Sequence, residues 1–407
     1  MADAFAPLRI LADRFEASAF DAPTGRARVR LVVRGKGAWD AVIVGDSLEL
    51  QAAPDHSRAD ALLVADPATW TSIASDVRGG MAAYQAGKLS VRQNLHLGAG
   101  FLAATGESGP GQLRYGTVET RLGAVSKVEA GEGPPVLMLH GLGGTKASFL
   151  PTIAALADRH RVIAIDQPGF GDSAKPFPAP YDARFFARWV EATFEALELD
   201  RAHVIGHSMG GRVALEFGLR RPDLVAGLVL MTPSMAWLEN RRWANYLRLV
   251  RPELAMLQPA PRPIIEGIVR RVVPGAADNW VRSGIDEFLR AYLTPRGRVA
   301  FYAAARQIYL EQPDGPNGFW TRLEGLRCES MFLWGRRDKV VPIGFERHVK
   351  RVLPRAEHVE VNSGHVPQLE NPGPTHAAIA SFLGRGDRRA HPAGARAARP
   401  ARRARPA

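Results

Sequence analysis

Short runs of alternating apolar and polar side chains fill the first part of the chain. Three of them cover residues 27–33, 38–44 and 47–51, with glycine-containing breaks between them. Alternation of this kind is typical of a strand with one buried face, and glycine supplies the backbone freedom of tight turns. The pattern predicts three antiparallel strands joined by short turns.

The next stretch mixes strand and helix signals. Asp66 followed by Pro67 is a typical helix start, because the carboxylate can accept from a first-turn amide and proline loses no hydrogen bond there. The further elements expected are a strand at 61–65, helices at 67–74 and 81–86, and a last strand within 88–97. Residues 1–105 are therefore predicted to form a small α+β domain, followed by a glycine-rich linker at 106–112.

From residue 113 onward the pattern changes to nearly continuous apolar runs. They cover residues 134–139, 161–166, 202–205, 224–231 and 331–334. Continuous runs are typical of strands buried on both faces, as in a parallel sheet with helices on either side. The second region, 113–385, is predicted to be an α/β domain.

One serine stands where such a strand turns into a helix. The sequence Gly206-His207-Ser208-Met209-Gly210 follows the apolar run 202–205 and precedes an amphipathic segment. A sharp strand-to-helix corner needs small residues two positions before and after the serine, and it leaves the hydroxyl exposed at the carboxyl end of the strand. Ser208 is thus a candidate nucleophile, although a glycine-rich chain can also contain this pattern by chance.

Two further residues follow strands in the order that such a serine requires. Asp338 comes after the apolar run 331–334, and His365 comes after the alternating run 358–361. Either residue alone could be an ordinary loop residue. Together they predict that His365 removes the proton of Ser208 and that Asp338 orients the histidine.

A glycine-rich loop, residues 140–144, directly follows the apolar run 134–139. With Ser208, Asp338 and His365 in this order, residues from about 113 to about 383 resemble an α/β-hydrolase. The resemblance implies a mostly parallel sheet with helices on both faces and a helical cap. It also implies an oxyanion hole built from the backbone N–H groups of Leu142 and Met209.

The segment 233–321 is longer than a simple crossover between two strands requires. We expect it to be a helical cap over the active site, with amphipathic helices that turn aromatic and aliphatic side chains inward. His140, Gly141, Trp237 and Trp243 are the expected substrate-binding residues. A cap lined in this way favours an apolar substrate, but the same side chains could simply form the core of the cap.

The first domain also resembles a known family. The segment Tyr84-Gln85-Ala86-Gly87-Lys88-Leu89-Ser90-Val91 and the later Leu95-His96-Leu97-Gly98 are similar to the sterol-carrier-protein type 2 lipid-binding domain. The resemblance implies a tunnel for fatty acyl chains, acyl-CoA or sterols. The alternative is a closed hydrophobic core without a tunnel.

The composition of the chain gives further expectations about its tail and its location. The chain has 407 residues, 46% of them hydrophobic, one cysteine and a net charge of +12. Much of the positive charge lies in the Arg/Ala/Pro-rich tail, residues 386–407, which is expected to be disordered. We expect the tail to contact anionic membranes at most peripherally and to bind no specific nucleic acid. The single cysteine and the absence of a signal peptide predict a cytoplasmic protein. No cofactor or metal is expected.

The residues leave four functions open. The first is hydrolysis of a carboxylic ester or thioester of an apolar, lipid-like acyl compound through an acyl-enzyme. The second is hydrolysis of a carbon–carbon bond in a vinylogous diketone acid, the third is acyl transfer to an alcohol or thiol, and the fourth is lipid binding or transport without catalysis.

Overall fold

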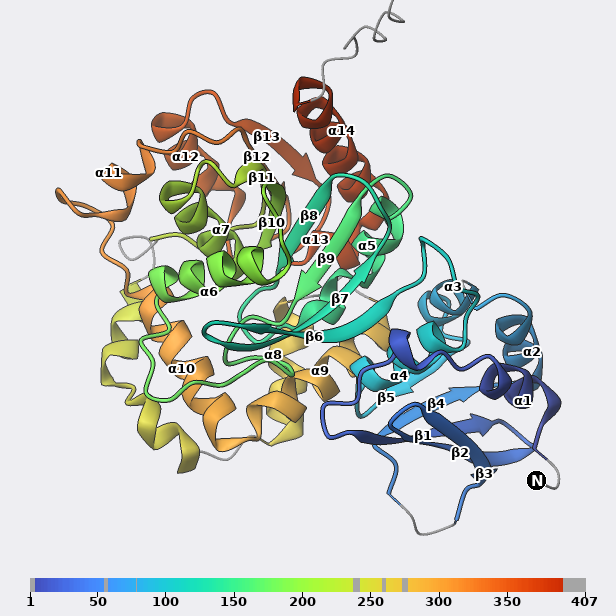
Figure 1. Ribbon diagram of the computed structural model, residues 1–407. Coiled ribbons are helices and arrows are strands. Elements are labelled where there is room, and N and C mark those ends of the chain that lie inside the picture. The colour runs from blue at the N-terminus through green and yellow to red at the C-terminus, as the bar shows by residue number, and fades with distance from the viewer. Residues whose placement is uncertain are drawn as a thin grey trace, which may run out of the picture.

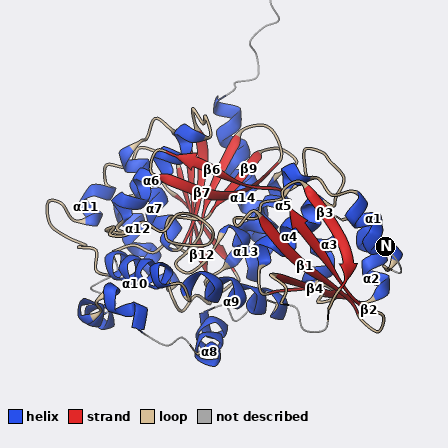
Figure 2. Ribbon diagram, turned by 60° about the horizontal axis from the view of Figure 1, so that its bottom comes forward, coloured by secondary structure: helices blue, strands red, loops and turns tan. Residues whose placement is uncertain are grey.

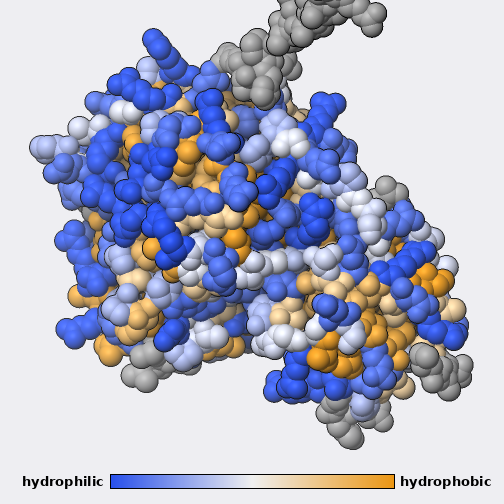
Figure 3. All heavy atoms as spheres, in the orientation of Figure 1, coloured by the Kyte–Doolittle hydropathy of each residue, from blue (hydrophilic) through white to orange (hydrophobic). Residues whose placement is uncertain are grey.

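The computed structural model describes residues 4–54, 58–77, 79–236, 242–257, 261–272 and 277–390. Within these residues the chain forms two sheets, one of five strands near the N-terminus and one of eight strands (Figure 1). The surface is largely hydrophilic, with apolar side chains gathered on part of the N-terminal region (Figure 3). The two sheets agree with the two patterns in the sequence, which are alternating runs before residue 105 and continuous apolar runs after residue 113.

The five-stranded sheet has the order β3-β2-β1-β4-β5. Its strands are β1 (Arg26–Val33), β2 (Gly37–Val44), β3 (Ser47–Ala52), β4 (Ala61–Ala65) and β5 (Ser90–Arg92). Its helices are α1 (Ala6–Asp13), α2 (Pro67–Ser75), α3 (Gly79–Gln85) and α4 (Leu95–Ala104). Every second residue of β1 is buried, as its alternating sequence predicts, and the Asp66 side chain accepts from Thr69 N at the start of α2.

The prediction of a last strand within residues 88–97 was wrong over most of that range. Only Ser90–Arg92 is extended, and α4 begins at Leu95. The Asn94 side chain accepts from Leu97 N and so caps this helix, which makes a helical start more favourable than a longer strand. Gln93 links the two elements with a φ of 70°, which turns the chain sharply between them.

The eight-stranded sheet has the order β13-β12-β11-β10-β8-β9-β7-β6. The strands are β6 (Arg114–Thr120), β7 (Gly123–Ala130), β8 (Pro135–Leu139), β9 (Arg161–Ile165), β10 (Ala202–His207), β11 (Val225–Met231), β12 (Ser330–Gly335) and β13 (Glu357–Val361). In this order, all neighbouring strands from β13 to β9 are parallel. Strand β7 pairs antiparallel with both of its neighbours, β9 and β6.

Helices cover both faces of this sheet (Figure 2). They are α5 (Leu150–Leu156), α6 (Ala183–Ala196), α7 (Met209–Arg220), α12 (Glu346–Val352), α13 (Pro367–Glu370) and α14 (Pro372–Ala390). Val136 and Met138 of β8 belong to the apolar cluster that includes α5 and α14, whereas Leu137 and Leu139 belong to the cluster with α6 and α7. Burial on both faces explains the continuous apolar runs in the sequence.

The described residues between β11 and β12 are largely helical, as expected for a cap. Its elements are the 3-10 helices η4 (Arg242–Leu249) and η5 (Pro252–Leu257) and the α-helices α8 (Arg262–Val272), α9 (Asp278–Tyr292), α10 (Pro295–Tyr309) and α11 (Phe319–Leu323). No described helix is both long and apolar enough to cross a bilayer.

The tail was expected to be disordered from residue 386, but α14 continues to Ala390. Asp387 explains part of this difference, because its carboxylate lies 2.9 Å from His160 Nε2 and 3.3 Å from His203 Nε2. These two contacts hold the last turns of α14 against the sheet. Residues 391–407 lie outside the described part of the chain.

Candidate active site

Ser208 lies at a strained corner between β10 and α7. Its φ of 51° and ψ of −115° place a non-glycine residue in a backbone region that costs about 1–3 kcal/mol. Its N–H donates to Met231 O, and its carbonyl accepts from Gly211 N and Ser234 N. The surrounding backbone therefore holds the strained conformation in place.

Two glycines make this corner possible. A Cβ atom at Gly206 would lie 2.4 Å from Gly210 O, and one at Gly210 would lie 2.0 Å from Leu139 O. No side chain fits at such distances, so the spacing predicted from the sequence has a direct steric cause.

Ser208, His365 and Asp338 form one chain of hydrogen bonds. The Ser208 hydroxyl donates to His365 Nε2 over 2.9 Å, and His365 Nδ1 donates to Asp338 Oδ2 over 2.8 Å. All three residues are buried, with 5–6% of each exposed. The structure thus brings together three residues that are far apart in the sequence, in the geometry of a nucleophile, a base and an orienting carboxylate.

Further contacts fix both partners of the serine. The backbone N–H groups of Val340 and Val341 donate to Asp338 Oδ1 over 2.6 and 2.9 Å. The Glu370 carboxylate accepts from the N–H groups on either side of His365, those of Gly364 and Val366. These bonds leave the imidazole little freedom to turn away from Ser208.

The glycine-rich loop 140–144 runs directly beside the serine. A Cβ atom at Gly141 would lie 3.2 Å from Ser208 Cβ, so only a bare backbone can approach this closely. Leu142 follows in the same loop and is half-buried, and Met209 is the first residue of α7, where an amide has no acceptor within the helix. Met209 thus adjoins Ser208 along the chain and Leu142 adjoins Gly141, and the two residues stay the predicted oxyanion donors.

His140 has a different environment from the one expected of a substrate-binding residue. The residue is fully buried, its Nε2 accepts from Gln167 N over 2.9 Å, and its Nδ1 lies 2.8 Å from Gly141 O. Burial lowers the pKa of His140. The expected contact with substrate is therefore replaced by a role in shaping the loop, because both ring nitrogens are engaged inside the protein.

Aromatic side chains of the cap cover the outer side of this loop. A narrow crevice there is lined by Gly143, Gly144, Gly169, Phe170, Phe288, Ala291, Tyr292, Gly297 and Phe301. The Phe288 ring lies 4.9 Å from that of Tyr292 and 5.5 Å from that of Phe301. Of the expected cap residues, Trp237 lies outside the described residues, and for Trp243 only the backbone in η4 is described.

Two residues that the sequence did not indicate contact this site. Ser234 Oγ lies 3.3 Å from Ser208 Oγ, and His207 Nε2 donates to the carbonyl of His365 over 2.7 Å. Burial and the neighbouring His365 lower the pKa of His207 to about 3, so its ring is neutral. The sequence offered one indication of Ser234, which is that it follows the apolar run 224–231. That run is a strand whose carboxyl end lies at the same edge of the sheet as the strand before Ser208.

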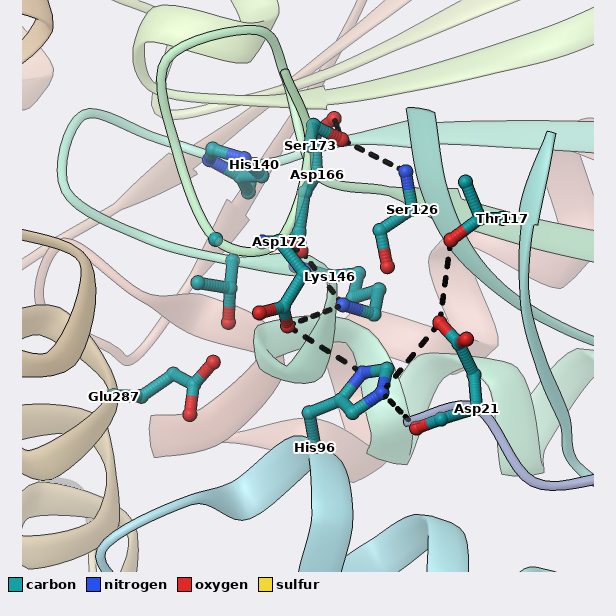
Figure 4. Close-up of polar contacts among 12 residues, drawn as sticks. Asp21, His96, Thr117, Ser126, His140, Lys146, Asp166, Asp172, Ser173 and Glu287 are labelled. Carbon is teal, nitrogen blue, oxygen red and sulfur yellow. Dashed lines mark hydrogen bonds and ion pairs between the residues drawn. The ribbon is translucent and has the colours of Figure 1, made fainter. Parts of the chain in front are cut away.

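A second buried cluster of charged residues lies near the loop, around Lys146 (Figure 4). Lys146 Nζ lies 2.6 Å from Asp166 Oδ2 and 3.5 Å from Asp172 Oδ2, and Arg290 of α9 binds Asp172 through both terminal nitrogens. Burial alone would lower the pKa of Lys146, but the two carboxylates raise it above its ordinary value.

His96 of α4 completes this cluster from the N-terminal region (Figure 4). Its Nε2 donates to Asp21 O over 2.8 Å, and its Nδ1 lies 3.6 Å from Asp172 Oδ2. Burial and the positive charge of Lys146 lower the pKa of His96 to about 4. The ring is therefore neutral near pH 7.

Other parts of the described chain offer no comparable site. No group of three or more histidine, cysteine, aspartate or glutamate side chains among the described residues is arranged to hold a metal ion. A surface cleft of about 800 Å³ is lined by residues such as Pro135, His203 and Cys328. It lies toward the amino ends of the parallel strands, at the edge opposite Ser208.

Comparison with known proteins supports the α/β-hydrolase fold. A family model described as the alpha/beta hydrolase fold matches residues 134–264. The 2-hydroxymuconate semialdehyde hydrolase of Pseudomonas sp. (strain CF600) is 26% identical over 274 residues, which cover 64% of this chain and 90% of that protein.

Two further similarities cover the same region. The dihydrolipoyllysine-residue acetyltransferase component of the acetoin cleaving system of Cupriavidus necator is 28% identical over 267 residues, covering 63% of this chain and 65% of that protein. The crystal structure of a membrane phospholipase A, described as a bacterial virulence factor, has a TM-score of 0.57 and 26% identity over 68% of this chain and 87% of its own.

Proposed function

Because this chain has an α/β-hydrolase fold, we propose that it is a serine hydrolase that cleaves a carboxylic ester or thioester of an apolar acyl compound. The observation that carries the proposal is the hydrogen-bond chain from Ser208 through His365 to Asp338, with the serine on a strained corner. A strained, buried serine bonded to a histidine has little structural use, whereas a nucleophile requires this geometry.

In the proposed reaction Ser208 Oγ attacks the carbonyl carbon while His365 Nε2 takes the hydroxyl proton. The negative charge on the carbonyl oxygen is stabilised by the N–H groups of Leu142 and Met209, and each such donor typically lowers the barrier by about 3 kcal/mol. The protonated His365 then gives its proton to the leaving alcohol or thiol. Water, deprotonated by the same histidine, releases the acyl group from Ser208.

The environment of the loop favours an apolar acyl group. Phe170, Phe288, Tyr292 and Phe301 line the crevice beside it, and the cationic Lys146 and Arg290 are already paired with carboxylates. Apolar rings beside the loop are better suited to an apolar acyl group than to a charged one, which is why we propose an apolar substrate. The likeness to a membrane phospholipase A supports the same choice of substrate class.

A second function has one specific observation in its favour. A relative is named as a 2-hydroxymuconate semialdehyde hydrolase, which supports carbon–carbon bond hydrolysis of a vinylogous diketone acid as the alternative. The same serine, histidine and aspartate would serve both reactions. A carboxylate on such a substrate would need a cation, and Lys146 and Arg290, two described cations near the loop, are paired with carboxylates, which makes the ester our first choice.

The proposal extends to the N-terminal region as a sterol-carrier-like lipid-binding domain. A five-stranded sheet with helices, together with the sequence from Tyr84 to Gly98, supports it. Against it, Trp70, Ile73 and Leu89 are almost fully buried in one apolar cluster, so a lipid that took their place would have to displace side chains. Saturable binding of a fluorescent fatty acid to the full chain would support lipid binding, and its absence would reject it.

A cytoplasmic location is also part of the proposal, since Cys328 is the one cysteine of the chain and cannot form an internal disulfide.

The test is ester hydrolysis by the purified chain and two variants. Wild-type protein should hydrolyse p-nitrophenyl acyl esters, and Ser208→Ala should lose at least about a thousandfold of that rate. Ser72→Ala, an exposed serine on α2, is the matched control and should retain full activity. Equal rates in wild type and Ser208→Ala would reject the proposal, and turnover of a vinylogous diketone acid without ester hydrolysis would favour the alternative.

A further inference from the structure

Cap helix α9 lies against the N-terminal region as well as against the active-site loop. Strand β5 is the edge strand of the five-stranded sheet, and α9 runs beside it and beside α4 (Figure 1). Ser283 Oγ donates to Val91 O over 2.5 Å, and Asn279 Nδ2 donates to Leu89 O over 2.8 Å. These side chains of α9 satisfy carbonyl groups that an edge strand would otherwise leave exposed.

Charged groups strengthen the same contact. Asp286 of α9 accepts from Arg92 Nε over 2.6 Å and from Gln93 N over 3.0 Å, and Glu287 accepts from Leu95 N over 3.2 Å. Asp286 and Glu287 are both buried. Hydrogen bonds to buried carboxylates are among the stronger ones, so the N-terminal region and α9 are firmly joined.

Aromatic packing adds to this junction. The rings of Tyr84 and Trp280 pack edge to face with their centroids 4.9 Å apart, and the Tyr84 hydroxyl donates to Asn279 O. In addition, one apolar cluster runs from the N-terminal sheet through Phe101 and Tyr115 into the α5 side of the large sheet. The two regions are therefore not joined by the linker alone.

The C-terminal half of α9 reaches the loop beside Ser208. A Cβ atom at Gly143 would lie 3.0 Å from the Phe288 ring, which shows how closely this ring covers the loop. Phe288 comes one residue after Glu287, so the residues that hold the N-terminal region and those that cover the loop belong to one rigid helix. A displacement at one half of α9 moves the other half with it.

The buried cluster around Lys146 provides a second link (Figure 4). Arg290 of α9 binds Asp172, Lys146 binds Asp166, and His96 of α4 lies against Asp172. Lys146 N also donates to Asp166 Oδ1 just after the glycine-rich loop, over 2.7 Å. The N-terminal region, α9 and the end of the loop thus share one set of buried charges.

We propose that the N-terminal region, residues 4–104, is a positioning element of the active site, which holds α9 so that Phe288 and Tyr292 form the acyl-binding wall beside the loop 140–144. The inference rests on the proposed function, since it concerns binding of the acyl group. Arg92, Asn279, Ser283 and Asp286 are then positioning residues, none of which touches the reacting atoms. Their loss weakens binding of a long acyl chain more than it slows the chemical step.

The experiment compares KM and kcat for p-nitrophenyl acetate and p-nitrophenyl octanoate in the full chain. Two variants break the contact from opposite sides: Arg92→Ala in the N-terminal region and the double variant Asn279→Ala/Ser283→Ala in α9. Each should raise KM for the octanoate about tenfold, as expected for the loss of buried hydrogen bonds. The kcat for the acetate should stay within about twofold of wild type, because Ser208 and its partners are untouched.

Arg282→Ala is the matched control, because Arg282 lies on the exposed side of the same helix. It should leave both KM values unchanged, while circular dichroism confirms that every variant is folded at the assay temperature.

The outcomes separate this inference from the proposed function. An active wild type whose octanoate KM is unchanged in both interface variants would overturn the positioning role alone. Equal losses with acetate and octanoate would also overturn it, since they would indicate general damage to the fold. A wild type without any Ser208-dependent hydrolysis would overturn the proposed function, and this inference with it.

Discussion

Two buried histidines of this protein each lie beside an aspartate, and their surroundings differ in an instructive way. His365 donates to Asp338 over 2.8 Å and accepts from a serine hydroxyl. His96 lies 3.6 Å from Asp172, but that carboxylate is already bound by Lys146 and Arg290. Burial, together with the positive charge of Lys146, lowers the pKa of His96 and keeps its ring neutral, and the neighbouring aspartate is occupied by the two cations.

The partners of the aspartate decide whether a buried His–Asp contact can take part in proton transfer. Within the described residues, the carboxylate at Asp338 accepts from His365 and two backbone amides and pairs with no lysine or arginine, so its charge is available to stabilise an imidazolium. The carboxylates at Asp166 and Asp172 are instead used to hold a lysine and an arginine. The first cluster can move a proton, and the second can hold loops and helices together.

The largest effect that separates the two clusters should come from Asp338→Asn. The amide cannot favour the tautomer in which His365 accepts the serine proton, and kcat should fall by about ten-thousand-fold. Steady-state ester hydrolysis measures this loss. Asp172→Asn, the corresponding change in the second cluster, should lower kcat far less, and a reversed order would contradict the distinction.

Lys146→Met should act on stability. The change leaves Asp166 without its buried cation and Asp172 with Arg290 alone, which should lower the free energy of unfolding by about 3–5 kcal/mol. Urea denaturation followed by circular dichroism gives the value. Lys350→Met removes the ion pair between an exposed lysine and the partly buried Glu346 and should cost at most about 1 kcal/mol. A similar loss of stability in both variants would show that burial of the cluster around Lys146 does not contribute to stability.

Lowering the pH should reduce the free energy of unfolding, because His96 of the second cluster is held neutral in the folded state. Its folded pKa of about 4 lies below the ordinary value of 6.5, so as the pH falls from 6.5 the unfolded chain takes up a proton that folded His96 does not. By pH 5 this difference should cost about 2 kcal/mol of stability, and no cost from this group remains above pH 7. The charged groups facing the ring are Asp21, Asp172, Lys146 and Arg290.

The comparison to make is between wild type and His96→Gln at pH 7 and pH 5. Other buried histidines, such as His207 and His376, also have lowered pKa values and contribute to the acid sensitivity of both proteins. The drop in urea midpoint should therefore be smaller in His96→Gln. Identical drops in the two proteins would show that His96 titrates normally in the folded state.

The smallest effect should come from Ser234→Ala. Ser234 Oγ lies 3.3 Å from Ser208 Oγ, and this long hydrogen bond should contribute a factor of about three to ten in kcat/KM. Ester hydrolysis with Ser234→Ala and Ser234→Thr tests it, since threonine retains the hydroxyl. Loss of activity in both variants would indicate a packing effect instead.

Much of this arrangement could be predicted from local patterns. The α/β-hydrolase fold is confirmed, because apolar runs buried on both faces leave a clear signal. Ser208 and Asp338 follow such runs and His365 follows an alternating run, and the structure brings the three together. Parallel strands place their carboxyl ends at one edge, which makes this kind of site readable without long-range information.

The parts that local patterns did not indicate depend on contacts between distant segments. Ser234, the cluster around Lys146 and the junction of α9 with β5 join residues that are separated by up to about two hundred positions. The start of α4 was misread because a single capping residue, Asn94, decides between strand and helix. The environment of His140 was also missed, since its partner Gln167 lies in another loop.

The central claim is that Ser208 carries the acyl group during turnover. Rapid acid quenching of the reaction with p-nitrophenyl octanoate, followed by mass spectrometry of proteolytic fragments, tests it most directly. We predict an octanoyl group on the fragment that contains Ser208 in the wild type and none in Ser208→Ala. Turnover that proceeds with no acyl group on this fragment, or with one on another residue, would contradict the account.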